Sequence, residues 1–159
     1  MPYQVAVCGP GECTPDEESA AHTVGRLLAE RGAVVICGGG SGVMAAAAAG
    51  ARAGGGPAIG VWPGATREGA APGLSAVLVT GMGQARNAIV AASADAVVVI
   101  GGSWGTLSEI ALARRREDAA VPVVSLGGWR VVDRDGRELP GIDHAPTPEA
   151  AVERALRGR

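Results

Sequence analysis

Lysine and phenylalanine are both absent from this chain of 159 residues. All 14 cationic residues are arginine, so the chain has no ε-amino group for a pyridoxal phosphate Schiff base or for a Walker A phosphate loop. Aromatic residues make up only 3% of the chain, and the core must therefore be built from valine, isoleucine, leucine and alanine. These small side chains predict helices that pack closely on a sheet.

A strong net charge is also absent. The formal charge of −2 gives no electrostatic reason to expect a nucleic acid or a membrane surface as a partner. The single basic run, Arg114–Arg116, has no interleaved aromatic residues for stacking on bases, and we interpret it as the solvated end of a helix. No apolar run is long enough to span a bilayer and the first residues lack a signal-peptide pattern, so we expect a cytoplasmic protein.

The three cysteines contain no CxxC pair. Cys8 and Cys37 end apolar runs, as small buried residues do, and Cys13 stands alone. We therefore expect no metal site, and nothing in the chain calls for a resident cofactor.

Short apolar runs alternate with alanine-rich helical segments, which is typical of βα units around a parallel sheet. Because the runs are continuously apolar, they predict strands buried on both faces. We expect one domain over residues 1–159, an α/β Rossmann-like doubly wound parallel sheet. Gly127–Pro146 contains a DG turn and is interpreted as a short hairpin or an irregular excursion. The expected strands are Gln4–Cys8, Ala33–Cys37, Ala58–Trp62, Ala76–Val79, Ala96–Ile100 and Val121–Leu126.

Capping residues mark the start of two helices. Thr14, Pro15 and Glu17 supply a capping box with a first-turn proline, and Thr147 with Pro148 opens the C-terminal helix in the same way. The first of these helices should end near Arg31, and the other expected helices are Val43–Ala53, Gln84–Ser93 and Thr106–Arg116.

Glycine recurs directly after a predicted strand and before a predicted helix, in VCGPGE, ICGGGSGVM and VIGGSWGTLSE. In an open parallel sheet these turns meet at the carboxyl edge, where the amides and dipole of a helix N-terminus favour phosphate. One such turn would be explained by tight-turn geometry alone, but three on one edge favour a nucleotide or phosphate site. None fits GxGxxG with a later acidic residue, which disfavours ordinary NAD binding. From the first two turns we expect ligand contacts at Gly9, Gly11, Gly38, Gly39, Gly40 and Gly42.

These segments resemble the LOG-like Rossmann proteins. The resemblance covers about Val5–Val124 and rests on VAVCGPGECTPDEESAAHTVGRLLAERGA, ICGGGSGVMAAAAAGA and GMGQARNAIVAASADAVVVIGGSWGTLSEIALA. The group includes cytokinin-activating phosphoribohydrolases, molybdenum cofactor carrier proteins and short bacterial chains labelled as possible lysine decarboxylases. The chain looks most similar to the short uncharacterised bacterial branch and the carrier proteins. A lysine decarboxylase label does not suit a chain without lysine.

In the hydrolytic members of this group, an arginine precedes a PGGxGTxxE motif. The resemblance implies that Glu109 is the catalytic acid of this motif and that Arg86 is the arginine. Ala85 and Asn87 replace the Glu and Lys that flank the arginine, and two positions of the motif itself also differ. The resemblance further implies that a phosphate is held by Gly101, Gly102, Ser103, Gly105 and Thr106.

Glu109 has a second interpretation, because Thr106-Leu107-Ser108-Glu109 also fits a capping box. Local sequence alone favours the cap, whereas the resemblance favours catalysis. Arg86 lies in an otherwise uncharged segment beside a glycine turn, which suits an anion. Trp104 fits either stacking on a base or packing within the fold.

The main functional expectation is hydrolysis of the N-glycosidic bond of a nucleoside 5′-monophosphate to free base and ribose 5-phosphate, with Glu109 stabilising an oxocarbenium-like state. The alternative is a binding or carrier protein that holds a phosphate-bearing ligand, such as molybdenum cofactor or a nucleotide, without cleaving it. The resemblance also implies a homodimer or larger homo-oligomer, with the cleft near the subunit interface.

Overall fold

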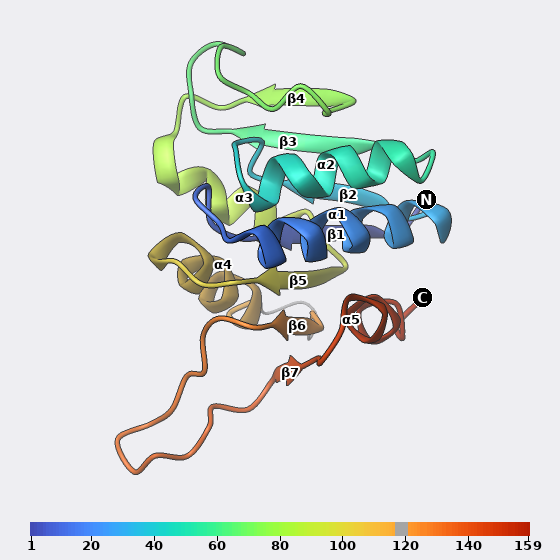
Figure 1. Cartoon of the computed structure of the whole chain (residues 1–159). Helices are drawn as coiled ribbons and strands as arrows, with labels where there is room; N and C mark the ends of the chain where they lie inside the picture. Colours follow the sequence, from blue (N-terminus) through green and yellow to red (C-terminus); the bar gives the residue numbers. More distant parts are fainter. Residues whose placement is uncertain (117–120) are drawn as a thin grey trace.

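A seven-stranded sheet forms the centre of the computed structural model of this chain, which describes residues 1–116 and 121–159 (Figure 1). All neighbouring strands are parallel, as the continuous apolar runs predict. Every expected strand is present, with its bounds within two residues of the prediction. The strands are β1 (Gln4–Cys8), β2 (Val34–Cys37), β3 (Ala58–Trp62), β4 (Ala76–Val79), β5 (Ala96–Ile100), β6 (Val123–Leu126) and β7 (Ile142–His144).

The order of the strands reverses between β1 and β5. From β1 the sheet extends through β2 and β3 to β4 on one side, and through β5 and β6 to β7 on the other. Cys8, the last residue of β1, lies beside Val99 of β5. Ligands of open parallel sheets bind at such a reversal, outside the carboxyl ends of the strands. The topology confirms the predicted doubly wound, Rossmann-like sheet and brings the turns after β1 and β5 together.

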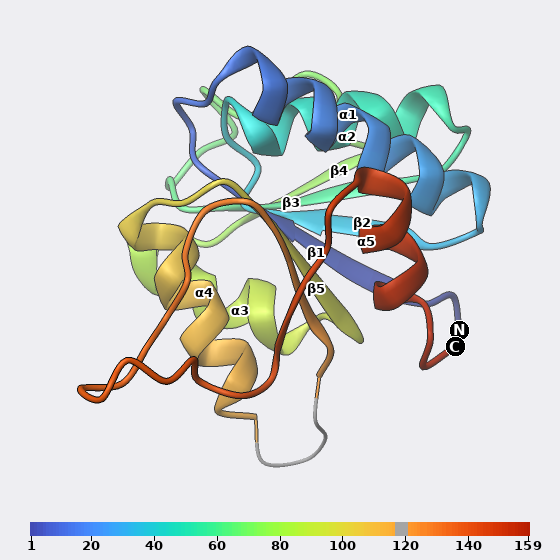
Figure 2. The same ribbon diagram turned by 60° about the horizontal axis from the view of Figure 1, so that its bottom comes forward.

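Helices cover both faces of the sheet (Figure 2). Three of them, α1 (Pro15–Glu30), α2 (Val43–Ala53) and α5 (Pro148–Ala155), pack on one face and enclose the larger part of the core. The other face carries α3 (Asn87–Ala92) and α4 (Trp104–Arg114). A 3₁₀ turn, η1 (Gly83–Arg86), occupies the start of the helix expected at Gln84.

Helices α1 and α2 approach each other closely because glycine lies at two points of contact. A Cβ added to Gly25 would lie 2.1 Å from the carbonyl oxygen of Ala47, and one added to Gly50 would lie 2.0 Å from that of His22. Neither position has room for a side chain. The two helices therefore pack on each other more closely than larger residues at these positions would allow.

The segment after β6 differs from the sequence expectation. Val132 and Glu138 form an antiparallel bridge on either side of the DG turn, so the predicted hairpin is present (Figure 1). The chain then returns to the body, where Ile142–His144 pairs with β6 as a seventh strand. This strand was missed because its three residues include Asp143 and contain no apolar run.

The described parts of the chain contain no helix that is long and apolar enough to cross a membrane. Within the same residues, no three His, Cys, Asp or Glu side chains gather as they would around a metal ion. The three cysteines are free, and Cys8 and Cys37 are buried as predicted.

Candidate functional site

A pocket of about 610 Å³ opens at the carboxyl edge of the sheet, where the turns after β1 and β5 separate. Elements from both halves of the chain form its wall: the turn after β1, the η1 and α3 segment, and the first turns of α4. The structure brings seven of the predicted site residues together here, namely Gly9, Gly11, Arg86, Ser103, Gly105, Thr106 and Glu109.

The second glycine turn lies behind this pocket and supports the first. Gly42 has a φ of +61°, and a Cβ at this position would lie 2.4 Å from the carbonyl oxygen of Pro10. The hydroxyl of Ser41 donates a hydrogen bond of 3.0 Å to the carbonyl oxygen of Gly11. Gly39 faces the backbone of Gly60 instead. Ligand contacts from Gly38 to Gly40 and from Gly42 therefore stay predictions.

The β5 turn leads into α4 through a capping box. The amide of Thr106 donates to Oγ of Ser103 at 3.2 Å, and the amide of Ser103 donates to Oγ1 of Thr106 at 2.6 Å. The helix therefore begins at Trp104, two residues earlier than predicted, and the expected box of Thr106 with Glu109 is wrong. First-turn amides have no acceptor within a helix, and the box uses that of Thr106. In the described part of the chain the amides of Trp104 and Gly105 have no hydrogen-bond acceptor, and both residues line the pocket.

Gly101 and Gly102 shape this turn from outside the pocket lining. Gly101 has a φ of +68°, and a Cβ there would lie 2.5 Å from Oε1 of Glu17, at the start of α1. Gly102 lies against the indole of Trp129, 3.2 Å from the position of an added Cβ. Their predicted contact with phosphate stays a prediction.

Glu109 lies in the second turn of α4, and only 6% of its surface is exposed. Desolvation raises the pKa of its carboxyl from 4.5 to about 7. The positive charge of Arg86 and a side-chain hydrogen bond with the thiol of Cys8 lower the pKa, and their effect is smaller than that of burial. A carboxyl in this state holds or releases a proton close to neutral pH.

Arg86 is the buried cation of the pocket, with 7% of its surface exposed. Its guanidinium occupies the space beside Gly38, where an added Cβ would lie 2.6 Å from Nη2. Nη1 donates a hydrogen bond to Oδ1 of Asn87. Nε is buried and has no hydrogen-bond partner among the described residues. Buried polar groups are rarely left unpaired, so this nitrogen has a donor that a ligand or a water molecule can satisfy.

Asn87 and Ser108 were missed from the sequence, although each is next to a predicted catalytic residue. The amide nitrogen of Asn87 donates to Oγ of Ser108 at 3.0 Å, and Ser108 donates to the carbonyl oxygen of Gly105 at 2.7 Å. This chain of hydrogen bonds connects Arg86 to the first turn of α4. Asn87 is 3% exposed, and that burial depends on the contact between α3 and α4.

Two tryptophans meet beside the pocket. Trp104 lines it from the first residue of α4, and its ring lies 5.5 Å from that of Trp129, centroid to centroid, at an interplanar angle of 42°. The indole N–H of Trp129 donates to the carbonyl oxygen of Ser103 at 2.8 Å. Trp129 comes from the segment after β6, which carried no signal for a site residue.

Comparison with known proteins identifies the family. The model of the SLOG cluster4 family matches residues 2–151. The chain belongs to this family. An uncharacterized protein from Archaeoglobus fulgidus is 39% identical over 153 residues, which cover 94% of this chain and 91% of that protein. The resemblance to LOG-like Rossmann proteins is thereby confirmed at the level of the superfamily. The expected similarity to the short uncharacterised bacterial branch and the carrier proteins stays a prediction.

Solved structures of the same fold include proteins that bind molybdenum cofactor. The molybdenum cofactor binding protein of Rippkaea orientalis is 34% identical, with a TM-score of 0.85 over 96% of this chain and 94% of that chain. A Moco carrier protein of Chlamydomonas reinhardtii is 29% identical, with a TM-score of 0.81 over the same shares of the two chains.

The burial of Glu109 predicts a pH dependence of stability. Its pKa is raised in the folded chain, so the folded state keeps a proton that the unfolded state releases above about pH 4.5. Raising the pH from 4.5 to 7 should therefore lower the free energy of unfolding by roughly 3 kcal/mol, from 1.36 kcal/mol for each pKa unit. Glu109→Gln should remove this decrease in the free energy of unfolding. Urea unfolding of both proteins at several pH values between 4.5 and 7 measures it. The exposed Glu68→Gln is the control, and parallel curves for wild type and Glu109→Gln would contradict the assignment.

Proposed function

We propose that this protein binds, as a carrier, a small molecule that bears a phosphate, and that the molybdenum cofactor class is its ligand. One observation carries the proposal: the N-terminus of α4 and the buried guanidinium of Arg86 open onto the same pocket. Each attracts an anion alone, and together they supply donors from two directions.

The phosphate is proposed to lie at the first turn of α4. The amides of Trp104 and Gly105 and the positive end of the helix dipole favour an anion there. The guanidinium of Arg86 fills the space beside Gly38 and donates a hydrogen bond to Asn87, and these contacts hold its charge at the pocket before the ligand arrives. Hydrogen bonds to a charged group contribute about 1.5–3 kcal/mol each.

Two further observations favour binding over cleavage. The solved relatives at 34% and 29% identity are described as molybdenum cofactor binding and carrier proteins. Beside Arg86, Asn87 uses its amide to connect Arg86 with Ser108, where the hydrolytic pattern has a lysine. The neighbourhood of the arginine is therefore built to position it and supplies no second cation.

Arg86→Gln tests the phosphate site, with ribose 5-phosphate as the probe and calorimetric titration as the measurement. We expect its affinity to fall at least tenfold, about 1.4 kcal/mol, because the buried charge is lost. Gly38→Ala should also lower the affinity for ribose 5-phosphate, since its Cβ would displace the guanidinium of Arg86.

Arg26→Gln is the matched control, because Arg26 pairs with Glu30 on α1 and is partly exposed. It should bind the probe as wild type does. The phosphate site is refuted if Arg86→Gln binds as tightly as this control.

A second candidate function is hydrolysis of a nucleoside 5′-monophosphate, and the buried Glu109 in the pocket beside Arg86 favours it. In that reaction the hydroxyl of a water molecule adds to the anomeric carbon as the N-glycosidic bond breaks, and the proton that the water loses passes through Glu109 to the departing base. Glu109 would stabilise the oxocarbenium-like state in its charged form and accept the proton of the attacking water.

Incubation with a panel of nucleoside 5′-monophosphates separates the two functions, and we expect all of them to be recovered intact. Release of free base by the wild type would overturn the carrier proposal. If base is released, Glu109→Gln should reduce the rate at least a hundredfold, about 2.7 kcal/mol, with little change in affinity. An unchanged rate in that variant would exclude Glu109 from the chemistry.

A further inference from the structure

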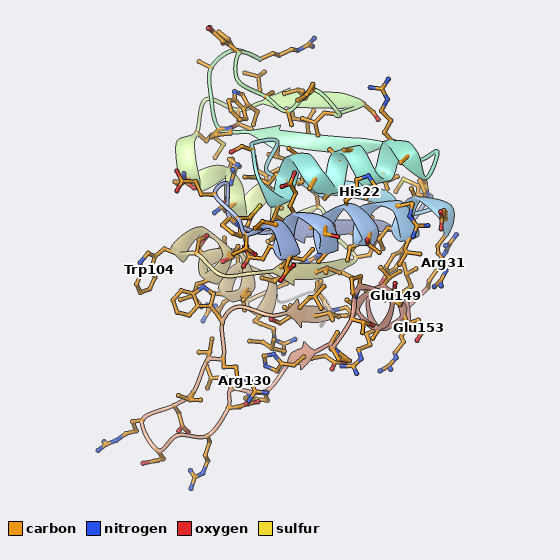
Figure 3. The ribbon with its side chains drawn as sticks, viewed as in Figure 1. His22, Arg31, Trp104, Arg130, Glu149 and Glu153 are labelled. Atoms are coloured by element: carbon orange, nitrogen blue, oxygen red, sulfur yellow. The ribbon has the colours of Figure 1, made fainter. Side chains whose placement is uncertain are left out.

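Trp104 is a large aromatic side chain that lines the pocket and stays exposed. It is 78% exposed, although it lines the same pocket as the buried Arg86. Figure 3 shows it at the start of α4, pointing away from the body of the molecule. A tryptophan in this position gains little from the core, so packing within the fold does not explain it.

Trp129 holds this exposed ring in place. Its indole N–H is bonded to the carbonyl oxygen of Ser103, and its ring meets that of Trp104 at 42°. The contact depends on Gly128, which has a φ of +84° and whose added Cβ would lie 2.0 Å from the carbonyl oxygen of Gly101. Trp104 is thus restrained before a ligand binds, which reduces the side-chain entropy lost on binding.

The position of Trp104 relative to the proposed phosphate site restricts the kind of ligand. Trp104 is the first residue of α4, so its ring is attached to the turn whose amides face the anion. Arg86, with 7% exposure and an unpartnered Nε, marks the same pocket as a ligand site independently of the helix. A ligand that reaches both the proposed phosphate site and the ring of Trp104 needs a phosphate and, close to it, an aromatic ring.

We propose that Trp104, braced by Trp129, stacks on a flat heteroaromatic ring of the phosphate-bearing ligand and selects ligands that have such a ring. This inference rests on the proposed function and adds to it the side chain that recognises the ring of the ligand, which is a pterin for the molybdenum cofactor class and a base for a nucleotide. Stacking on tryptophan tolerates either ring, because each presents a π face. Selectivity between the two rings comes from other contacts.

Three probes that share a phosphate test this inference by titration: ribose 5-phosphate, guanosine 5′-monophosphate and neopterin monophosphate. For the wild type, we expect at least one of the two ring-bearing probes to bind tenfold or more tightly than ribose 5-phosphate. Trp104→Ala removes the ring and keeps the main-chain amide of the phosphate site, so it should abolish this difference. Trp104→Phe, which keeps an aromatic ring, should retain part of the difference.

Leu112→Ala is the matched control, because Leu112 is another exposed apolar side chain of α4 and lies outside the lining of this pocket. It should bind all three probes as wild type does. Quenching of tryptophan emission by the ring-bearing probe should persist in Leu112→Ala and be lost in Trp104→Ala.

Three other outcomes would overturn the stacking role, and they differ in what they imply for the phosphate site. If ribose 5-phosphate binds but neither ring-bearing probe binds better, the stacking role is overturned and the phosphate site stands. If none of the three probes binds the wild type, the proposed function fails, and the stacking role fails with it. If Trp104→Ala changes the molar mass measured by light scattering and leaves the three affinities unchanged, Trp104 is a contact between copies of the chain and the inference is wrong.

Discussion

The reversal of strand order between β1 and β5 is the constraint on which the rest of the structure depends. Because the two strands are adjacent and lead to helices on opposite faces, the turns that follow them separate and leave a pocket between them. Gly9 allows the first turn to approach the core closely, since an added Cβ would lie 2.7 Å from the carbonyl oxygen of Ile100. The pocket is therefore a consequence of topology, and the side chains only determine what it accepts.

Desolvation determines the chemistry of that pocket. Glu109 and Arg86 are both nearly buried, yet the carboxyl has a pKa raised to about 7, because the cost of burying its charge exceeds the stabilisation from Arg86. A pocket with one permanent cation and one carboxyl that is easily protonated has a net preference for anions. This balance suits a phosphate ligand, and it also leaves Glu109 able to exchange a proton with whatever the pocket holds.

The fold followed from the sequence because each expected strand is a continuous apolar run and each glycine turn comes directly after one. Glu109 and Arg86 were found through a motif, and the structure places both in one pocket. The start of α4 was misplaced because Thr106 fits two capping boxes, one with Ser103 before it and one with Glu109 after it. In the structure Thr106 forms the box with Ser103. The hydrogen bond between Asn87 and Ser108 and the tilted contact of Trp129 with Trp104 could not be predicted, since both join segments that only the folded sheet brings together.

A crystal structure of the protein grown or soaked with inorganic phosphate tests the proposed phosphate site. One anion should lie at the start of α4, within hydrogen-bonding distance of the amides of Trp104 and Gly105 and of the guanidinium of Arg86. A structure at saturating phosphate in which this turn is empty, while phosphate is held by exposed arginines elsewhere, would contradict this placement.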